Sequence, residues 1–222
     1  MSTSAGRPRV DRRARRRAET RAKLMEAARA TFARQGVDAT RINEITDEAD
    51  LGFGSFYNYF DSKDAIVTAV VEEVVTAAGE AIAAATKDIE DPAEVVAVAH
   101  RSIEHRAAEE PDFGWLLVRL EISHDLVFAA LGPYAARDLD RGIAAGRFEV
   151  ADPAVALIAA GGALLAIVRA VLQGRAKPTA TEQHAAYVLR MFGLPPDDAA
   201  EVASRPLPTG DWIHPKAAPS DG

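Results

Sequence analysis

Prolines at regular intervals are the feature that most constrains this chain. After Lys63 the sequence has helical periodicity, interrupted by six proline-containing breaks, which fall at Asp91-Pro92, Glu110-Pro111, Gly132-Pro133, Asp152-Pro153, Lys177-Pro178 and Pro195-Pro196. Because a proline inside a helix removes a backbone hydrogen bond, each break predicts a helix boundary. No run alternates apolar and polar residues for long enough to indicate a strand, and the segment lengths suit antiparallel packing. The expected fold class is all-α.

Shorter helices are predicted before Lys63. Residues 19–35 carry apolar side chains three and four positions apart, which is typical of a helix. A second helix is expected from Thr40, a candidate N-cap, to about Leu51, and a third over 54–60. Three short helices with a glycine-containing turn between the second and third form a helix-turn-helix pattern.

The charge distribution separates a basic head from an acidic body. The formal net charge is -7, yet residues 1–64 carry 13 Lys and Arg against 10 Asp and Glu, and residues 7–34 carry 11 against 3. This split is typical of a small DNA-binding head. We therefore expect a flexible basic arm, a helix-turn-helix DNA-binding domain, a larger helical domain and a disordered tail. Their ranges are 1–18, 19–64, 65–204 and 205–222.

Several function classes are disfavoured. The chain has no cysteine, which excludes disulfides, thiolate zinc sites and a cysteine nucleophile. His100 and His105 are five residues apart rather than the three or four that share a helix face, and there is no nucleophile elbow, phosphate loop or metalloprotease motif. The other histidines are His124, His184 and His214. We expect no enzyme activity, no metal site and no cofactor.

Nothing in the sequence favours a membrane. The basic first residues precede no apolar run, so neither a signal peptide nor an anchor is expected. Residues 153–168 are apolar but shorter than the roughly 18 to 20 residues that a span needs, and they run into Arg169. We interpret this segment as a buried helix of a cytoplasmic protein with no membrane partner.

Residues 40–64 resemble the DNA-binding segment of the TetR/AcrR family of bacterial regulators. The motif Gly54-Ser55-Phe56-Tyr57-Asn58-Tyr59-Phe60, followed by Ser62-Lys63-Asp64, is similar to that family's recognition helix and the start of its next helix. The match is strong over residues 20–70 and extends beyond them only in helix layout. Leu51-Gly52-Phe53 departs from the family pattern, which often has a serine here that caps the recognition helix.

The resemblance implies a sequence-specific transcriptional regulator. It also implies that the larger helical domain, residues 65–204, is an effector-binding and dimerisation domain. Such proteins bind a near-palindromic operator in double-stranded DNA as a homodimer, and the family tendency favours a repressor released by a small-molecule effector, whose identity the sequence does not reveal. The alternative is a ligand-binding or assembly protein of the same fold that does not regulate through DNA.

The DNA-reading face follows from a helical wheel over residues 54–60. Phe56 and Phe60 fall on the side of the apolar stripe, so the other side chains face outward. Asparagine can pair with adenine, tyrosine can reach phosphates or thymine methyls, and glycine permits close approach. Phe53 either contacts the DNA backbone or packs under the helix. The candidate DNA-binding residues are Thr40, Arg41, Phe53, Gly54, Ser55, Tyr57, Asn58, Tyr59, Lys63, Arg12, Arg13 and Arg16.

Phosphate contacts are expected from the basic residues of this set. For Arg41 and Lys63, the resemblance implies positions against the DNA backbone. The arginines of the N-terminal arm either reach an adjacent groove or raise affinity through counterion release. The alternative for the arm is a solvated basic run with no DNA role.

Two further sites are expected in the body. The helix from Pro153 to Gln173 is apolar nearly all round, so it needs burial on every side, and the resemblance places the dimer interface on the last two main helices. The alternative is that this helix forms the centre of the monomer's own core. The candidate interface residues are Ala160, Gly161, Leu164, Ile167, Val168, Val171, Leu172, Tyr187 and Met191.

An effector pocket is implied by the resemblance and is expected between Pro111 and Pro133. Aromatic side chains with a few polar groups lie there, as a small-molecule cavity requires. Ordinary core packing explains Trp115 and Phe128 about as well. The candidate pocket residues are Phe113, Trp115, Leu116, Arg119, His124 and Phe128.

Overall fold

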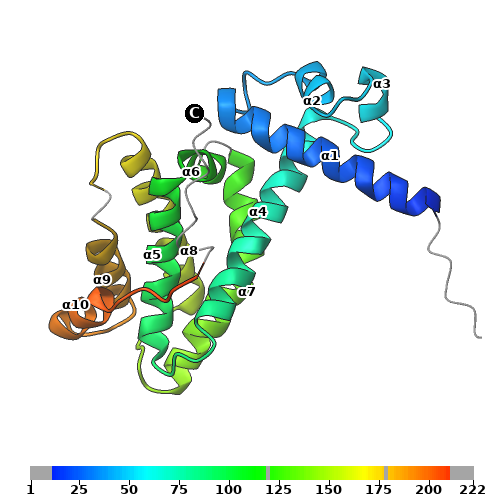
Figure 1. Ribbon diagram of the computed structural model, residues 1–222. Coiled ribbons are helices and arrows are strands. Elements are labelled where there is room, and N and C mark those ends of the chain that lie inside the picture. The colour runs from blue at the N-terminus through cyan, green and yellow to red at the C-terminus, as the bar shows by residue number, and fades with distance from the viewer. Residues whose placement is uncertain (1–11, 119–120, 178–179, 211–222) are drawn as a thin grey trace, which may run out of the picture. The chain divides into compact units, whose positions relative to one another are not determined.

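Helices are the only regular secondary structure in the described part of the chain. The computed structural model describes residues 12–118, 121–177 and 180–210 (Figure 1). The chain divides into two compact units, residues 1–70 and 71–222. The expected all-α class is therefore confirmed, and the division between the units falls within the long helix α4 rather than at its start.

The first unit holds the three predicted helices, of which the first is long rather than short, at 24 residues. They are α1 (Arg12–Gln35), α2 (Ile42–Glu48) and α3 (Phe53–Phe56), followed by the beginning of α4 (Lys63–Ala85). Helix α2 packs against both α1 and α3. Leu24, Phe32, Ile45, Phe56 and Phe60 are all buried, so the predicted apolar stripe is confirmed as core.

Helix boundaries in the first unit differ from the prediction. Helix α1 begins at Arg12, so residues 12–18 belong to it rather than to an arm. Arg15 and Glu19 pair one turn apart at 2.8 Å, which supports a helix that lacks apolar periodicity there. The third helix starts at Phe53 and ends at Phe56, and residues 57–59 form a turn in place of the predicted helix over 54–60.

The second unit is a bundle built around one helix. Its elements are the remainder of α4, α5 (Pro92–Glu109), α6 (Pro111–Val118), α7 (Glu121–Ala144), α8 (Pro153–Leu172), α9 (Thr181–Met191) and α10 (Pro196–Ser204). Helix α5 contacts α6, α7, α8, α9 and α10, and α9 packs on α10 beside it (Figure 1). Eleven of the residues of α5 are buried, which makes it the central helix of this unit.

The predicted break at Pro133 is wrong. Helix α7 runs through Pro133 without ending, because one lost backbone hydrogen bond is tolerated where packing holds both sides of the helix. Val127 and Leu139, before and after the proline, are buried. Four other predicted prolines are the first residues of α5, α6, α8 and α10, where a missing N–H costs nothing. Pro178 lies outside the described residues.

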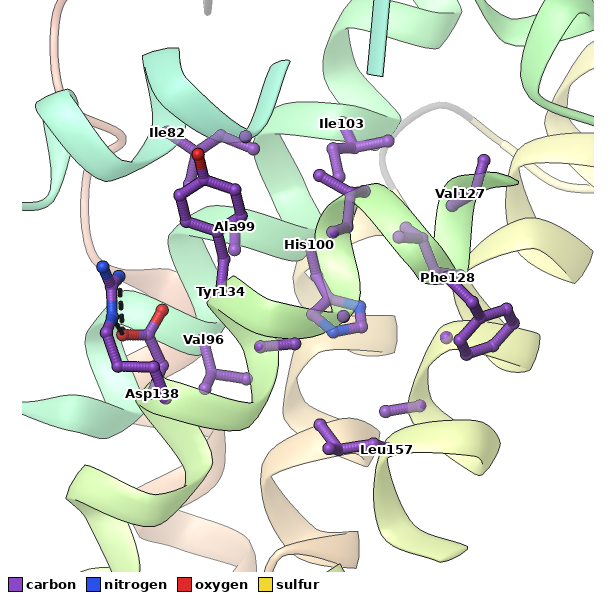
Figure 2. Close-up of a pocket in the computed structure, with 18 of the residues that line it drawn as sticks. Ile82, Val96, Ala99, His100, Ile103, Val127, Phe128, Tyr134, Asp138 and Leu157 are labelled. Carbon is purple, nitrogen blue, oxygen red and sulfur yellow. Dashed lines mark hydrogen bonds and ion pairs between the residues drawn. The ribbon is translucent and has the colours of Figure 1, made fainter. Parts of the chain in front are cut away.

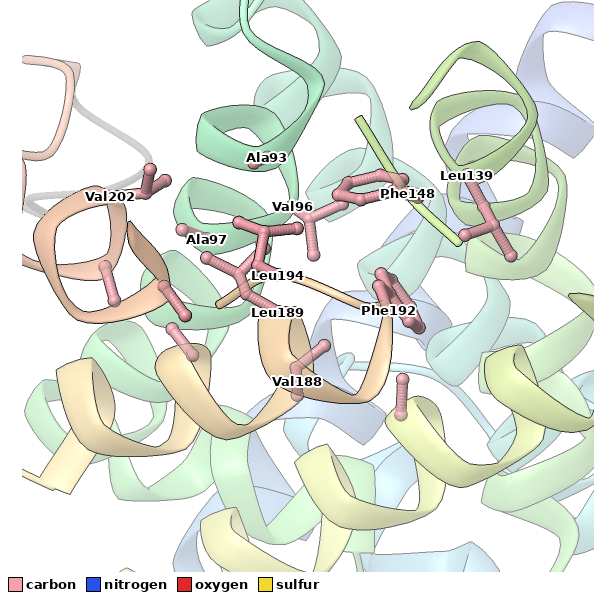
Figure 3. Packing of buried hydrophobic residues seen from close by; sticks show 14 of the residues in the cluster. Ala93, Val96, Ala97, Leu139, Phe148, Val188, Leu189, Phe192, Leu194 and Val202 are labelled. Atoms are coloured by element: carbon pink, nitrogen blue, oxygen red, sulfur yellow. The ribbon is translucent and has the colours of Figure 1, made fainter. Parts of the chain in front are cut away.

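A cluster of buried apolar side chains joins α5, α7, α8, α9 and α10 (Figure 3). Phe148, which follows α7, meets Phe192 at the end of α9 edge to face, with ring centroids 5.4 Å apart. A Cβ at Gly142 would lie 2.0 Å from the Phe148 ring. Glycine at this position therefore lets the Phe148 ring lie directly on helix α7.

Ion pairs at the edge of this cluster connect the start of α5 with α10 and with the residues that follow α7 and α10. Arg147 bonds Asp91, the N-cap of α5, at 3.0 Å and also Asp198 of α10. Arg205 bonds Glu94 at 2.6 Å and Asp91 at 3.2 Å. Burial disfavours the Asp91 carboxylate, but hydrogen bonds from Arg147 and the Ala93 N–H outweigh it and lower its pKa. The hydrogen bond from Arg147 likewise lowers the pKa of Asp198.

Arg147→Ala should weaken this unit at neutral pH more than in acid. Because the pKa values of Asp91 and Asp198 lie below their usual value of about 3.9, the ion pairs stabilise the fold above that pH and lose their effect as the pH falls through the lowered values. We expect a free energy of unfolding lower by about 1 kcal/mol at neutral pH, measured by urea unfolding at neutral and acid pH. Arg175→Ala, an exposed arginine elsewhere, is the control. An equal loss for Arg147→Ala at both pH values would contradict this role.

Candidate DNA-binding and ligand-binding sites

The turn between α2 and α3 depends on Asp50 rather than on a glycine. Asp50 has φ 54°, a left-handed conformation that aspartate tolerates better than most residues. The Leu51 N–H then donates to the Thr46 carbonyl at 2.8 Å, which closes the end of α2. Gly52 is the N-cap of α3 and has no side chain to cap it, as the departure from the family pattern predicted.

Thr40 does not cap α2 as predicted. The N-cap is Arg41, and its backbone N–H donates to the Glu44 carboxylate at 2.7 Å. This hydrogen bond lowers the pKa of Glu44. Thr40 is buried and its hydroxyl donates to the Gly36 carbonyl at 2.7 Å. Its side chain therefore stabilises the α1–α2 turn and does not reach the surface where DNA would bind.

An exposed face remains on α3 and the turn after it. Phe53 and Tyr57 are about half exposed, at 53% and 49%, and their rings meet edge to face with centroids 5.6 Å apart. Gly54 and Asn58 are exposed and Ser55 is half-buried. A Cβ at Gly54 would meet nothing within 4 Å. Of the two alternatives for Phe53, the exposed one is observed.

Arg17 positions the turn after α3. Its Nη2 donates to the Asn58 carbonyl at 3.0 Å, and its guanidinium lies 5.5 Å from the centroid of the Tyr59 ring. Tyr59 is half-buried. Arg13 lies one turn before Arg17, and residues four apart share one helix face. The first turns of α1 therefore border the candidate DNA-binding surface.

The other basic candidates also lie in this unit. Arg12, Arg16 and Arg41 are exposed. Lys63 is half-buried and its Nζ donates to the Asp38 carbonyl at 3.2 Å, so it ties the α1–α2 loop to the start of α4. An ammonium has three donors, and two remain for a phosphate.

A cavity lies within the second unit, between α4, α5, α7 and α8 (Figure 2). Its volume is about 120 Å³. It is lined mainly by apolar side chains, among them Ile82, Ile103, Val127, Phe128 and Leu157. Four lining residues carry polar groups that could orient a ligand. These are His100, Tyr134, Arg137 and Asp138.

The cavity includes only part of the predicted pocket. Phe128 lines it, whereas Phe113, Trp115 and Leu116 do not. Phe113 and Leu116 are buried in the core, and the Arg106 guanidinium lies 5.2 Å from the centroid of the Phe113 ring. Arg119 and the side chain of His124 lie outside the described residues. Sequence reasoning missed the contributions of α4, α5 and α8, because it considered only the segment between Pro111 and Pro133.

Beside the cavity lies a buried polar cluster formed by His100 and Glu104 of α5 and His184 of α9. His184 Nδ1 and Glu104 Oε1 are 2.5 Å apart, and the two imidazole centroids are 5.4 Å apart. Burial, with the neighbouring His184, lowers the pKa of His100 to about 3, so this imidazole is neutral at physiological pH. Burial raises the pKa of Glu104, although the hydrogen bond and charge of His184 oppose it. The three side chains offer ligand atoms within 4.8 Å of one another, so they could hold a metal ion.

Helix α8 has two apolar faces with different surroundings. Ala160, Leu164 and Val168 are buried within the protomer, so these predicted interface residues are not available to a partner. Gly161 faces Phe128, whose ring a Cβ would meet at 2.7 Å, and Ile167, Val171 and Leu172 are half-buried. Among the described helices, only α8 is long and apolar enough to cross a membrane by length and composition.

The opposite face of α8 carries exposed apolar side chains, and so does α9. Val155 and Ile158 are 60% and 64% exposed, and Tyr187 and Met191 of α9 are 54% and 40% exposed. A Cβ at Gly162 would meet nothing within 4 Å. We name Val155, Ile158, Gly162, Tyr187 and Met191 the outer face. Of the predicted interface residues, Tyr187 and Met191 belong to it.

Both units match known families by sequence. Residues 24–70 match the family described as "Bacterial regulatory proteins, tetR family". Residues 91–205 match the family described as "Tetracyclin repressor-like, C-terminal domain". The second match alone spans more than half of the chain.

Two curated relatives match about a quarter of the chain. YvdT, an HTH-type transcriptional regulator of Bacillus subtilis, is 35% identical over 54 residues, which cover 24% of this chain and 28% of that protein. An HTH-type regulator encoded in the lacX 3' region of Lactococcus lactis is 39% identical over 56 residues, or 25% and 29% of the two chains. These matches therefore span less than a third of the relatives' length.

Solved structures resemble almost the whole chain. RolR in complex with the ligand resorcinol has a TM-score of 0.79 and 36% sequence identity, and the match covers 88% of this chain and 98% of RolR. RolR without ligand gives a TM-score of 0.76 with 35% identity, over 85% and 98% of the chains. FadR from Bacillus subtilis, in complex with stearoyl-CoA, has a TM-score of 0.66 and 17% sequence identity, and the match covers 77% of this chain and 98% of FadR. This similarity shows a common fold.

Proposed function

Because this chain belongs to the TetR family of bacterial transcriptional regulators, we propose that it is a repressor that binds a near-palindromic operator as a homodimer and is released by a small aromatic effector. The observation that carries the DNA-binding part is the exposed face formed by Phe53, Gly54, Tyr57 and Asn58, with arginines of α1 at its border. We infer no enzyme activity and a cytoplasmic location, where a regulator meets DNA.

Each side chain of this face has a DNA contact that suits it. The Asn58 amide can make paired hydrogen bonds to an adenine edge, and the missing side chain of Gly54 lets the backbone approach the groove. Tyr57 and Phe53 offer aromatic surface to thymine methyls or sugars. Arg12, Arg13, Arg16, Arg41 and Lys63 supply phosphate contacts, which raise affinity without choosing bases. Thr40 supports this surface only through the turn it stabilises.

The outer face supports the homodimer. One helix-turn-helix head contacts few base pairs, so proteins of this class pair their heads on two half-sites. Large apolar side chains that stand more than half exposed, such as Val155 and Ile158, mark an interaction surface when they are contiguous. Gly162 would let two helices approach closely. The proposed interface is therefore the outer face, and not the buried side of α8.

The cavity supports a single-ring effector. The cavity measures about 120 Å³, which is close in size to the apolar cavity of about 150 Å³ that binds benzene in another protein. This space suits one aromatic ring better than a long acyl chain. The polar groups of Tyr134 and Asp138 can hydrogen-bond ring hydroxyls. Resorcinol, the ligand of RolR, is a ring of this kind, and we propose a phenolic compound of similar size as the effector.

Release from DNA would follow from a shift between two conformations. A ligand favours whichever conformation binds it better, so an effector that fits the cavity only when the heads are wrongly spaced for the operator would reduce DNA affinity. The rival function, a protein of this fold that does not act on DNA, gives no reason for an exposed polar and aromatic face bordered by arginines.

Operator binding should depend on the face after α3. In the double variant Tyr57→Ala/Asn58→Ala, affinity for the intergenic DNA beside the gene should fall at least about tenfold, because a good base contact contributes roughly 1–3 kcal/mol. Fluorescence anisotropy at low and moderate salt, with competitor DNA, measures this. Lys87→Ala, in the other unit, is the control. Equal binding by the double variant would favour the rival function.

Dimerisation should depend on Ile158. Ile158→Glu places a charge in the proposed interface, where its burial without a partner is costly, so the protein should sediment as a monomer and lose operator affinity. Ile143→Glu, the same change at an isoleucine of α7 that is 36% exposed, should remain dimeric. A dimer of unchanged stability in Ile158→Glu would place the interface elsewhere.

Effector binding should depend on free space in the cavity. Ala99 lines it, so Ala99→Phe should fill it, abolish measurable resorcinol binding by calorimetry and leave operator binding intact in the presence of resorcinol. Ala200→Phe, at an exposed position of α10, is the control. If the wild-type chain binds no resorcinol, related phenols are tested in the same way. If resorcinol still releases the Ala99→Phe variant from the operator, the cavity is not the effector site.

A further inference from the structure

The cluster of His100, Glu104 and His184 borders the cavity, but the proposed effector binding does not depend on it. His100 and Glu104 lie four residues apart on α5, which places them on one helix face. His184 comes from α9, which packs directly on α5. The side chains of Glu104 and His184 are only 1% and 9% exposed. Packing of two helices has therefore gathered two imidazoles and one carboxylate in an apolar interior.

Three atoms of the cluster lack a hydrogen-bond partner in the described part of the chain. They are Nδ1 of His100, Oε2 of Glu104 and Nε2 of His184. Buried polar atoms are nearly always paired, and those that are not call for an ion, a water or a functional role. Each of these three is a lone-pair donor in the neutral imidazole or ionised carboxylate. A cation bound by all three side chains would supply a partner that the cluster lacks.

We propose that His100, Glu104 and His184 bind one zinc-type divalent transition-metal ion. Two imidazole nitrogens and one carboxylate oxygen form a ligand set that such ions prefer. Magnesium and calcium take oxygen ligands almost exclusively and do not suit it. This assignment differs from the expectation drawn from sequence, which compared only the spacing between histidines.

The geometry needs a small adjustment. Zinc bonds nitrogen and oxygen at about 2.0–2.2 Å, so ligand atoms around a tetrahedral ion are roughly 3.3 Å apart. One possible ligand atom from each of the three side chains lies within 4.8 Å of the other two. His184 Nδ1 and Glu104 Oε1, which are 2.5 Å apart, are hydrogen-bonded to each other. Rotation of the Glu104 side chain would open this contact and free both side chains to bind the ion.

The surrounding charges allow a cation. Arg101 is the basic side chain next to Glu104, and its guanidinium is engaged with the Arg205 carbonyl at 2.5 Å and with Glu182 at 3.4 Å. Its hydrogen bonds therefore go to these acceptors, although its charge also acts on Glu104. Ionisation of Glu104 on metal binding would offset part of the charge of the ion.

The test uses the full chain, stripped of metal by a chelator and titrated with Co²⁺, whose visible absorption is strong in tetrahedral sites and weak in octahedral ones. We expect saturation at one ion per chain with a tetrahedral spectrum, displacement by Zn²⁺, and no displacement by excess Mg²⁺. Weak octahedral absorption, or Co²⁺ uptake that never saturates, would overturn the proposal.

Variants locate the ion. His184→Gln and Glu104→Gln should each weaken Co²⁺ and Zn²⁺ binding by about a hundredfold or more. His105→Gln, on the same helix and next to Glu109, should bind like the wild type. Circular dichroism checks that each variant is folded. Unchanged binding in His184→Gln or loss in His105→Gln would assign the metal to other histidines. Metal binding is read without DNA or effector, so its failure leaves the proposed function intact.

Discussion

Burial of helix α5 is the constraint on which the second unit depends. It contacts five other helices, and in a helix enclosed in this way an unpaired polar group is costly. Its N-terminus is fixed by the pairs of Asp91 and Glu94 with Arg147 and Arg205. His100 and Glu104 lie in the middle of the helix, and His100 also lines the cavity. Helix α5 therefore contributes to the core, to the cavity and to the polar cluster. A ligand bound in the cavity or in the cluster would directly contact the helix against which the other helices pack.

Helix α8 shows how one apolar sequence serves two purposes. Its buried side, with Ala160 and Leu164, completes the core and lines the cavity, while Ile158 and Val155 on the opposite side stand exposed. A helix with such a pattern has an apolar side that its own chain does not cover. The proposed dimer contact and the proposed effector site thus lie on opposite sides of the same helix, which gives a short physical route by which a ligand could alter how two protomers pair.

In the DNA-binding unit, side chains that support the surface are distinct from those that form it. Thr40 and Glu44 are engaged with backbone groups of the α1–α2 turn, and Arg17 holds the backbone of Asn58. These bonds fix the short helix α3, which has no side-chain cap of its own. Tyr57 and the amide of Asn58 are then left exposed and oriented by their neighbours. Precise base contacts need that support, because a four-residue helix has little stability alone.

The sequence by itself determined the helical class, the order of helices, the apolar stripe of the head and the exposed motif around Tyr57, because periodicity, prolines and local spacing are properties of neighbouring residues. It also placed four of the six prolines correctly at helix starts. It could not show that packing would carry α7 through Pro133, or that Thr40 would turn inward to the Gly36 carbonyl. Only the tertiary structure shows which side of α8 is core and that His184 lies beside His100 and Glu104. The second contact joins residues about eighty positions apart. The free energy of such long-range contacts cannot be inferred from a local sequence pattern.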